Sequence, residues 1–373
     1  MTTTTPTPTP GHSAHPDVLL SVEGLKAHFH TDDGVVRAVD GISFDLHRGE
    51  VFAVVGESGS GKSVMAMTIM GLVPDVTIAG GAIRWKGDDL LSMSEEQRRR
   101  IRGGEIAMIF QDPLTALNPV HTVGRQIGEM ARIHEGIGKK QAMERAIEML
   151  DLVGIPEARK RASMYPHEFS GGMRQRAMIA MAITCKPDLL IADEPTTALD
   201  VTVQAQVLEV LLDIKDEIDS AIMLITHDLG VVAGLSDRVM VMYAGRQAEI
   251  GTTSEVFYEA RHPYTLGLLA SLPRVDDRGD EPLLPIPGSP PSLIRRPSGC
   301  PFHPRCRFAR LPGPCDQDVP ELRLVAGDAH CSACHYAETL EDVTVESLRS
   351  SVDEDELVAS EDDRPVTIEG GEG

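Results

Sequence analysis

Short apolar runs alternate with longer amphipathic stretches along most of this chain. Residues 19–29, 35–39 and 42–46 are β-branched and alternating, which predicts three antiparallel strands. A further strand is expected at 80–85. Four later runs are mostly apolar, as in buried strands; they cover residues 51–55, 106–110, 188–194 and 221–226. These patterns place the chain in the α/β class.

Helical spacing fills the intervals between the later strands. Residues 64–72 and 177–184 have the apolar content of helices. Between residues 123 and 153, apolar positions such as Met143 and Ile147 recur at helical spacing among charged residues. The sequence therefore predicts a helical insertion between two strand-rich parts.

The two ends of the chain differ from its middle in composition. Residues 1–17 are rich in Thr and Pro and poor in apolar residues, so they are not expected to fold. Residues 337–373 hold thirteen Asp or Glu and two Arg, a net charge of −11, which is half of the chain's −22. We expect this acidic tail to be disordered as well.

Overall composition excludes several function classes. The chain has 373 residues, 35 of them basic and 57 acidic, and this balance argues against a nucleic-acid-binding surface. No run approaches the roughly 18 apolar residues of a membrane span, and the N-terminus lacks the pattern of a secretory signal. We therefore expect a cytoplasmic protein whose membrane role, if it has one, depends on partners.

One segment between a predicted strand and a predicted helix has the form G-x-x-x-x-G-K-[ST] of a phosphate-binding loop. In such a loop, backbone N–H groups and the start of the following helix surround the phosphates. The loop consists of Gly56, Glu57, Ser58, Gly59, Ser60, Gly61, Lys62 and Ser63. Lys62 is expected to reach the β- and γ-phosphates, and the Ser63 hydroxyl to ligate Mg²⁺. The sequence thus predicts a nucleoside triphosphate site.

Two further motifs fit such a site. Ser170 and two glycines precede an apolar helix, where exposed N–H groups favour an anion. Asp193 and Glu194 end a buried strand, so Asp193 is expected to be a second Mg²⁺ anchor and Glu194 to activate water. Phe29 is a candidate to stack on an adenine ring, or equally a core or edge aromatic.

Taken as a set, six motifs resemble those of the ATP-binding-cassette (ABC) ATPases in order and spacing. They are the phosphate loop, Gln111, Ser170-Gly171-Gly172-Met173-Arg174-Gln175, Asp193-Glu194, Ala198-Leu199-Asp200 and His227. The resemblance implies a P-loop NTPase cassette over residues 18–255. Such a cassette has a RecA-like core, an antiparallel β subdomain and a helical subdomain at about 112–170. Met173 departs from the commonest family motif, which has Gln there.

The resemblance also implies a mechanism. Two cassettes pair head to tail, and each ATP lies between the phosphate loop of one and the Ser170 motif of the other. The ATP contacts would include Gly171, Gly172 and Gln175, together with Asp200 across the dimer interface. Ser63, Gln111 and Asp193 would hold Mg²⁺, and Asp193 would do so through water.

For catalysis, the same resemblance assigns three side chains. Glu194 would polarise the attacking water, and His227 would contact the γ-phosphate. Gln111 would sense that phosphate and link the site to the helical insertion. The enzyme implied is an ATPase whose hydrolysis is coupled to transport.

The C-terminal third narrows the resemblance. Residues 261–269 and 299–306 resemble the extension of oligopeptide/dipeptide ABC importer ATPases, which we expect at residues 256–336. That family implies three kinds of partner: two transmembrane permeases, an extracytoplasmic peptide-binding protein and a second cassette. In this family the two paired cassettes are more often different chains than two copies of one chain. The protein would sit at the cytoplasmic face of the membrane. Nickel and glutathione importers are close relatives, so the cargo stays open.

The six cysteines are unevenly distributed. Cys185 lies far from the other five in the sequence, and we expect it to be a small buried apolar residue and not a metal ligand. The clustered set expected to act together is Cys300, Cys306, Cys315 and Cys334, with Cys331 as an alternative fourth member. In the importer subfamily these four thiolates are associated with an iron–sulfur cluster, and the resemblance implies that it is a [4Fe-4S] cluster. Zinc, and free thiols or disulfides, are the alternatives.

The cysteine cluster lies far from the phosphate loop in sequence. We therefore expect it to have a structural role and not to take part in ATP hydrolysis. It would hold in place a proline-rich extension that begins with a stiff connector at 282–287. Two rival functions remain. A soluble ABC ATPase acting on nucleic acid or ribosomes usually has two cassettes or a long insertion, and an exporter cassette is often fused to membrane spans.

Overall fold

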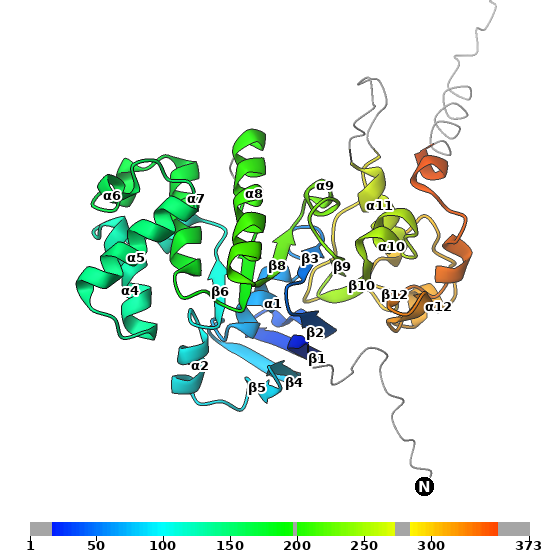
Figure 1. Ribbon diagram of the computed structural model, residues 1–373. Coiled ribbons are helices and arrows are strands. Elements are labelled where there is room, and N and C mark those ends of the chain that lie inside the picture. The colour runs from blue at the N-terminus through cyan, green and yellow to red at the C-terminus, as the bar shows by residue number, and fades with distance from the viewer. Residues whose placement is uncertain (1–16, 197–199, 273–283, 350–373) are drawn as a thin grey trace, which may run out of the picture.

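The computed structural model describes residues 17–196, 200–272 and 284–349. Two sheets occupy its middle, with the helices α4–α6 gathered at one end and the C-terminal extension at the other (Figure 1). In the described part of the chain, no helix combines the length and the apolar content needed to cross a membrane.

The first sheet is antiparallel and has the strand order β2-β1-β4-β5. Its strands are β1 (Val18–Thr31), β2 (Gly34–His47), β4 (Val76–Trp85) and β5 (Asp88–Asp89). The prediction of separate strands at 35–39 and 42–46 is wrong, because both runs belong to β2. Gly41 interrupts the apolar pattern with a φ of 89°, and the β1–β2 register shifts beside it, between Leu25 and Lys26. A glycine bulge of this kind lets one strand continue through a break in its pattern.

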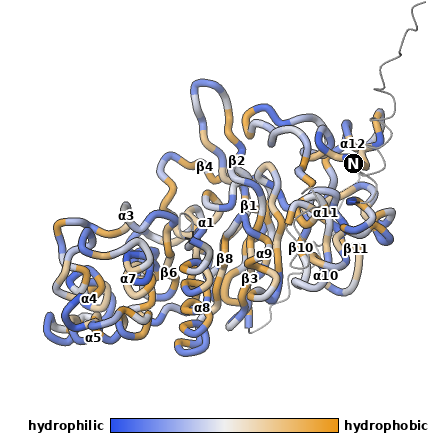
Figure 2. The backbone as a smooth tube through the Cα atoms, turned by 90° about the horizontal axis from the view of Figure 1, so that it is seen from above, coloured by the Kyte–Doolittle hydropathy of each residue, from blue (hydrophilic) through white to orange (hydrophobic). Residues whose placement is uncertain are grey.

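The second sheet has eight strands in the order β11-β12-β10-β9-β3-β8-β7-β6. Pairing is parallel from β9 to β6 and antiparallel from β9 to β11. The parallel strands are β3 (Val51–Val55), β6 (Ile106–Ile109), β7 (Leu189–Asp193), β8 (Ala221–Thr226) and β9 (Arg238–Tyr243). Strands β3, β6, β7 and β8 are buried throughout, and Figure 2 shows β3 and β8 as apolar segments. This burial confirms the four apolar runs as interior strands.

Helices flank this sheet and form the separate end seen in Figure 1. The larger ones are α1 (Lys62–Ile69), α2 (Glu95–Ile101), α4 (Val123–His134), α5 (Lys139–Leu152), α7 (Gly171–Ile183), α8 (Val201–Ile218), α10 (Thr253–Tyr258) and α11 (Pro263–Ala270). Short turns of helix are α3 (Pro113–Ala116), α6 (Ala158–Arg161), α9 (Leu229–Val232), α12 (Pro314–Gln317), η1 (Pro166–Glu168), η2 (His303–Arg305) and η3 (Ala337–Leu340). The predicted helical insertion at 123–153 is two helices, α4 and α5, which pack on α7 through one apolar cluster.

The C-terminal extension continues the second sheet. Its strands β11 (Arg323–Ala326) and β12 (His330–Ser332) pair with each other, and β12 pairs with β10 (Arg246–Thr252) of the cassette. The extension's Arg296 also donates to the buried Asp40 of β2, at 2.7 Å. The cassette and the extension therefore share a sheet and a polar contact, which the sequence did not predict.

One predicted boundary changes. The acidic tail was expected to be disordered from residue 337, but residues 337–349 are packed: Leu340 is buried and Leu348 lies against the same apolar cluster. The remaining residues, 350–373, fall outside the described part, as do residues 1–16. The predicted connector at 282–287 begins outside the described residues, and its Ile286 packs on the extension's core.

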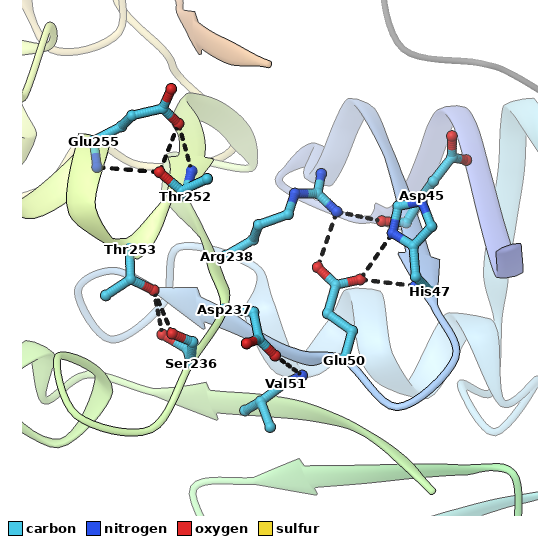
Figure 3. A network of polar contacts seen from close by, with 10 residues as sticks. All are labelled: Asp45, His47, Glu50, Val51, Ser236, Asp237, Arg238, Thr252, Thr253 and Glu255. Atoms are coloured by element: carbon cyan, nitrogen blue, oxygen red, sulfur yellow. Dashed lines mark hydrogen bonds and ion pairs between the residues drawn. The ribbon is translucent and has the colours of Figure 1, made fainter. Parts of the chain in front are cut away.

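A polar network joins the entry of β3 to β9 (Figure 3). The Glu50 carboxylate accepts from Arg238 Nη1 at 3.0 Å and from the His47 backbone N–H at 2.7 Å. Asp237 accepts from the Val51 backbone N–H at 2.8 Å. The side chain of Glu50 is 7% exposed, so the network replaces water for a buried charge.

Removal of this buried carboxylate should cost stability. Glu50→Ala leaves Arg238 without its carboxylate partner, and we expect the free energy of unfolding in urea to fall by about 2–3 kcal/mol. Glu96→Ala is the matched control, because its pair with Arg100 is 77–78% exposed and should change stability by less than about 0.5 kcal/mol. Equal losses for the two variants would contradict the role given to the network.

Candidate functional site

The predicted site residues meet at one edge of the parallel sheet. The strands β3, β8, β7 and β6 are neighbours, and they run in the same direction. The phosphate loop follows β3, His227 follows β8, Asp193 and Glu194 end β7, and Gln111 follows β6. Carboxyl ends of adjacent parallel strands form the usual binding crevice of open α/β sheets. The topology therefore brings together four motifs that lie up to 171 residues apart in sequence, from Gly56 to His227.

Glycine is required at two loop positions. A Cβ on Gly56 would stand 2.2 Å from the Met242 carbonyl oxygen, and one on Gly61 would stand 2.1 Å from that of Ala38. Both residues have positive φ, at 150° and 102°. The loop can thus wrap closely against its surroundings, with Gly61 as the N-cap of α1.

The Lys62 ammonium lies inside the loop. Its Nζ donates to the carbonyls of Gly56 at 2.7 Å and Glu57 at 3.0 Å, and the residue is 4% exposed. Burial lowers the pKa of Lys62, and the charges of Glu194, Asp193 and Glu57 oppose that shift. The Ser60 hydroxyl, also buried, has no hydrogen-bond partner among the described residues. A confined cation and an unsatisfied hydroxyl in one loop fit a bound polyphosphate.

Oxygen ligands for a hard cation lie beside this lysine. Ser63 Oγ donates to Asp193 Oδ1 at 2.9 Å, and Asp193 is 5% exposed. Desolvation raises the pKa of the Asp193 carboxyl, and the adjacent Glu194 charge adds to the effect, against the Ser63 hydrogen bond. A hydroxyl and a carboxylate at this spacing are ligands of the kind that Mg²⁺ prefers. Mg²⁺ held there would neutralise phosphate charge during transfer.

Glu194 lies between two of the predicted catalytic side chains. Gln111 Nε2 donates to Glu194 Oε2 at 3.0 Å, and His227 Nδ1 is 3.5 Å from Glu194 Oε1. The Glu194 backbone has a φ of 47°, in the left-handed region that non-glycine residues seldom adopt. Strained backbone of this kind concentrates at functional sites. The arrangement fixes a carboxylate where a water could be oriented for attack.

Other predicted residues lie apart from this group. Ser170 is exposed and caps α7, accepting from the Met173 N–H at 3.3 Å, and Gly171 and Gly172 form the first residues of that helix. Asp200 caps α8 in the same way, through Val203 at 3.0 Å. No hydrogen bond or ion pair within the described ranges joins residues 170–175 to the phosphate loop. That geometry leaves the exposed Ser170 end of α7 open to a second molecule.

Three remaining predictions have separate outcomes. Gln175 is buried at 2% exposure, and its Nε2 has no partner in the described structure. Phe29 lies in β1 opposite Val36 and Val76, half-buried, and its adenine contact stays a prediction. Ala198 and Leu199 are outside the described residues.

The four predicted cysteines converge. Cys300, Cys306, Cys315 and Cys334 line one small cavity with His303 and His335, whereas Cys331 lies in β12 and packs in another cluster. Burial, reinforced by the neighbouring thiols, raises the pKa of Cys306 to about 12 and of Cys334 to about 11. Even so, no group of three or more His, Cys, Asp or Glu in the described chain is spaced to hold a metal ion. The metal-binding character predicted for the extension therefore does not appear in the side-chain geometry.

One contact at the site was missed by sequence reasoning. No contact between the extension and the phosphate loop was predicted, but Arg305 of the extension forms two hydrogen bonds with Glu57. Tyr264 adds a third contact to the same residue. The only signal was that both residues occur inside C-terminal segments with a family resemblance, and that resemblance assigned them no role.

Two known family patterns match this chain, one in the cassette and one at the C-terminal extension. The sequence pattern of the ABC transporter family matches residues 39–197, and that of the oligopeptide/dipeptide transporter C-terminal region matches residues 248–312. The Bacillus subtilis dipeptide transport ATP-binding protein DppD is 53% identical over 318 residues, 85% of this chain and 94% of that protein. The Salmonella typhimurium oligopeptide transport ATP-binding protein OppD is 54% identical over 293 residues, 79% and 87% of the two chains.

Solved structures agree on the fold. The dimeric ATP-binding cassette MJ0796 with ADP and phosphate has a TM-score of 0.57 at 22% identity, covering 63% of this chain and 99% of that one. The cbiO1 protein of Clostridium perfringens has a TM-score of 0.55 at 28% identity, covering 65% and 91%. Fold and site together define an ABC ATPase. More narrowly, the chain belongs to the family of oligopeptide/dipeptide transport ATP-binding proteins.

Neutralising the Glu194 side chain should separate binding from hydrolysis. In Glu194→Gln we expect ATP affinity to persist and the rate of hydrolysis to fall by about 10²–10⁴-fold, the usual contribution of a positioned base. ATP titration and steady-state phosphate release measure the two quantities. Glu209→Gln, an exposed acid on α8, is the control and should keep the wild-type rate. A Glu194→Gln rate within a few-fold of wild type would remove this residue from the mechanism.

Proposed function

We propose that this chain is the ATP-hydrolysing subunit that powers peptide import across the cytoplasmic membrane. The observation that carries the proposal is Glu194, held between Gln111 and His227 beside the Ser63–Asp193 pair. The extension with its peptide-transporter pattern at residues 248–312 supports the cargo class. The names of the relatives, dipeptide and oligopeptide transport ATP-binding proteins, support it as well.

In this function the residues act mainly by positioning. Lys62 and the loop N–H groups would bind the phosphates, and Ser63, Asp193 and Gln111 would hold Mg²⁺. Glu194 accepts hydrogen bonds from the attacking water, and His227 orients toward the γ-phosphate. Phosphoryl transfer depends on such fixed donors and charges more than on any single base. Ser170 and Asp200, exposed on the cap positions of α7 and α8, complete the ATP site of a second cassette.

The partners proposed are two transmembrane permeases, a peptide-binding protein outside the membrane and a second cassette that differs from this one. The chain would then lie on the cytoplasmic face of the membrane as a peripheral subunit. Exposed apolar side chains in the helical subdomain support a docking face there, since Val120 is 71% and Ile133 is 64% exposed. Nickel, glutathione or another small solute is the alternative cargo. Action on nucleic acid or ribosomes is disfavoured by the net charge of −22.

Affinity purification from membranes should test the assembly. We expect the tagged full chain to recover two polytopic membrane proteins and a second cassette, and the complex in proteoliposomes to accumulate peptide only with hydrolysable ATP. The Glu194→Gln variant should recover the same partners without peptide uptake. Recovery of ribosomes or DNA in place of the membrane proteins would reject the importer function, and uptake of nickel or glutathione but not peptides would reassign the cargo.

For the extension, we propose that Cys300, Cys306, Cys315 and Cys334 hold an iron–sulfur cluster, with zinc as the alternative. Convergence of the four thiols on one cavity supports this, as does the position of Cys331 elsewhere. Four thiolates suit either centre. Among the described residues, no group of three or more His, Cys, Asp or Glu is arranged to hold a metal ion, so the thiols would have to rearrange on binding.

Matched cysteine variants should identify the ligands. Anaerobically purified protein should contain iron and absorb at about 400 nm, as iron–sulfur proteins do. Cys306→Ser should lose both signals, and Cys331→Ser should keep them, because Cys331 faces a different cluster. Stoichiometric zinc without iron would favour the alternative, and absence of both metals would leave these residues as free thiols.

A further inference from the structure

Two residues of the C-terminal third hold the second residue of the phosphate loop. The Glu57 backbone N–H donates to Tyr264 Oη at 2.8 Å. Its carboxylate accepts from Arg305 through two bonds, Nη1 to Oε2 at 2.7 Å and Nη2 to Oε1 at 2.9 Å. A bidentate pair of this kind fixes direction as well as distance. Both the backbone and the side chain of Glu57 are therefore restrained from outside the loop.

Arg305 is itself held firmly in place. Its Nε donates to the Pro287 carbonyl at 2.8 Å, and its Nη1 to Tyr243 Oη at 3.2 Å. The guanidinium also lies 5.8 Å from the centre of the Tyr243 ring. The side chain is 5% exposed, against 26% for Glu57. Arg305 thus acts as a fixed charge rather than a mobile surface arginine.

The aromatic residues behind it form a rigid support. The ring centres of Tyr243 and Tyr264 are 4.6 Å apart, and the Phe302 ring lies 5.2 Å from the first and 5.3 Å from the second. Tyr264 is fully buried, and burial raises the pKa of its hydroxyl, which stays protonated. The packing of these three rings holds the Tyr264 hydroxyl in place, and that hydroxyl in turn holds the Glu57 N–H.

The charge of Glu57 matters because of where it lies. The Lys62 ammonium donates to the backbone carbonyl of the same residue at 3.0 Å, so the Glu57 carboxylate belongs to a residue in direct contact with that charge. An unpaired carboxylate in the phosphate loop would repel the triphosphate and compete with it for that lysine. Arg305 neutralises this carboxylate and leaves the charge of Lys62 available to the phosphates.

We propose that Arg305 is a positioning residue for ATP: by neutralising Glu57, and with Tyr264 fixing its amide, it makes ATP affinity depend on the C-terminal extension. The residue does not touch the reacting atoms. Its effect passes through Glu57, so it should alter binding of the triphosphate more than the chemical step. This inference concerns ATP binding alone and holds whatever the cargo is.

Substitutions at the two partners separate charge from folding. In Arg305→Gln we expect the dissociation constant for Mg-ATP and the KM for ATP to rise about tenfold, with kcat within about twofold of wild type, because a close unscreened charge has an effect of this order. Adding Glu57→Gln to that variant removes the repelling carboxylate and should restore the affinity to within about threefold. Arg307→Gln, two residues away and exposed, is the control and should match wild type.

Two more variants guard against a purely structural explanation. Arg305→Lys keeps the charge but loses the second hydrogen bond, so its affinity should lie between wild type and Arg305→Gln. Tyr264→Phe keeps the ring and removes the acceptor for Glu57, and it should weaken ATP binding without the Glu57→Gln rescue. Urea unfolding of the full chain accompanies each titration.

The outcomes distinguish the alternatives. An unchanged ATP affinity in Arg305→Gln would overturn the proposal. So would a double variant as weak as Arg305→Gln, or a fall in kcat that follows the loss of folding stability, because each would assign Arg305 to the fold alone.

Discussion

The parallel alignment of β3, β8, β7 and β6 is the constraint on which this structure depends. Each strand is buried along its whole length, and each delivers one motif to the same edge. Because neighbouring strands are about 4.8 Å apart, residues that follow them can reach one another with short side chains. Gln111 and Glu194 follow the adjacent strands β6 and β7 and meet in this way. Ser63 reaches Asp193 from the first turn of α1, because β8 lies between β3 and β7. Without the sheet, these residues would be separate motifs with no shared chemistry.

The site carries opposed charges in a partly dry crevice. Lys62 and Asp193 are both nearly inaccessible, and burial shifts the pKa of each toward its neutral form. Each charge opposes the shift of the other, so the two residues balance desolvation against attraction. A polyphosphate with Mg²⁺ supplies both a partner for the lysine and a cation for the carboxylate. Ligand binding thus completes the electrostatic balance of the site.

The C-terminal extension is part of the cassette rather than an attachment to it. Strand β12 pairs with β10, Arg296 reaches Asp40 of β2, and Arg305 reaches Glu57 of the phosphate loop. Each contact joins residues more than 80 positions apart, and none has a periodicity or spacing of its own. Sequence patterns detect local repetition, and these contacts have none to detect. For this reason the contact of the extension with the phosphate loop could not be predicted from the sequence.

The sequence by itself determined the buried strands, the helices α1 and α7 and the phosphate loop, because apolar periodicity and glycine spacing are local properties. It also indicated which four cysteines would converge, through their resemblance to a known extension. Only the tertiary structure decided that β2 is one strand through the bulge at Gly41, and that α8, β9 and β10 complete the core. It alone decided that Gln175 is buried and that Glu57 is held by Arg305 and Tyr264. These outcomes depend on which distant segments pack together, and that is settled by the whole chain folding around its parallel sheet.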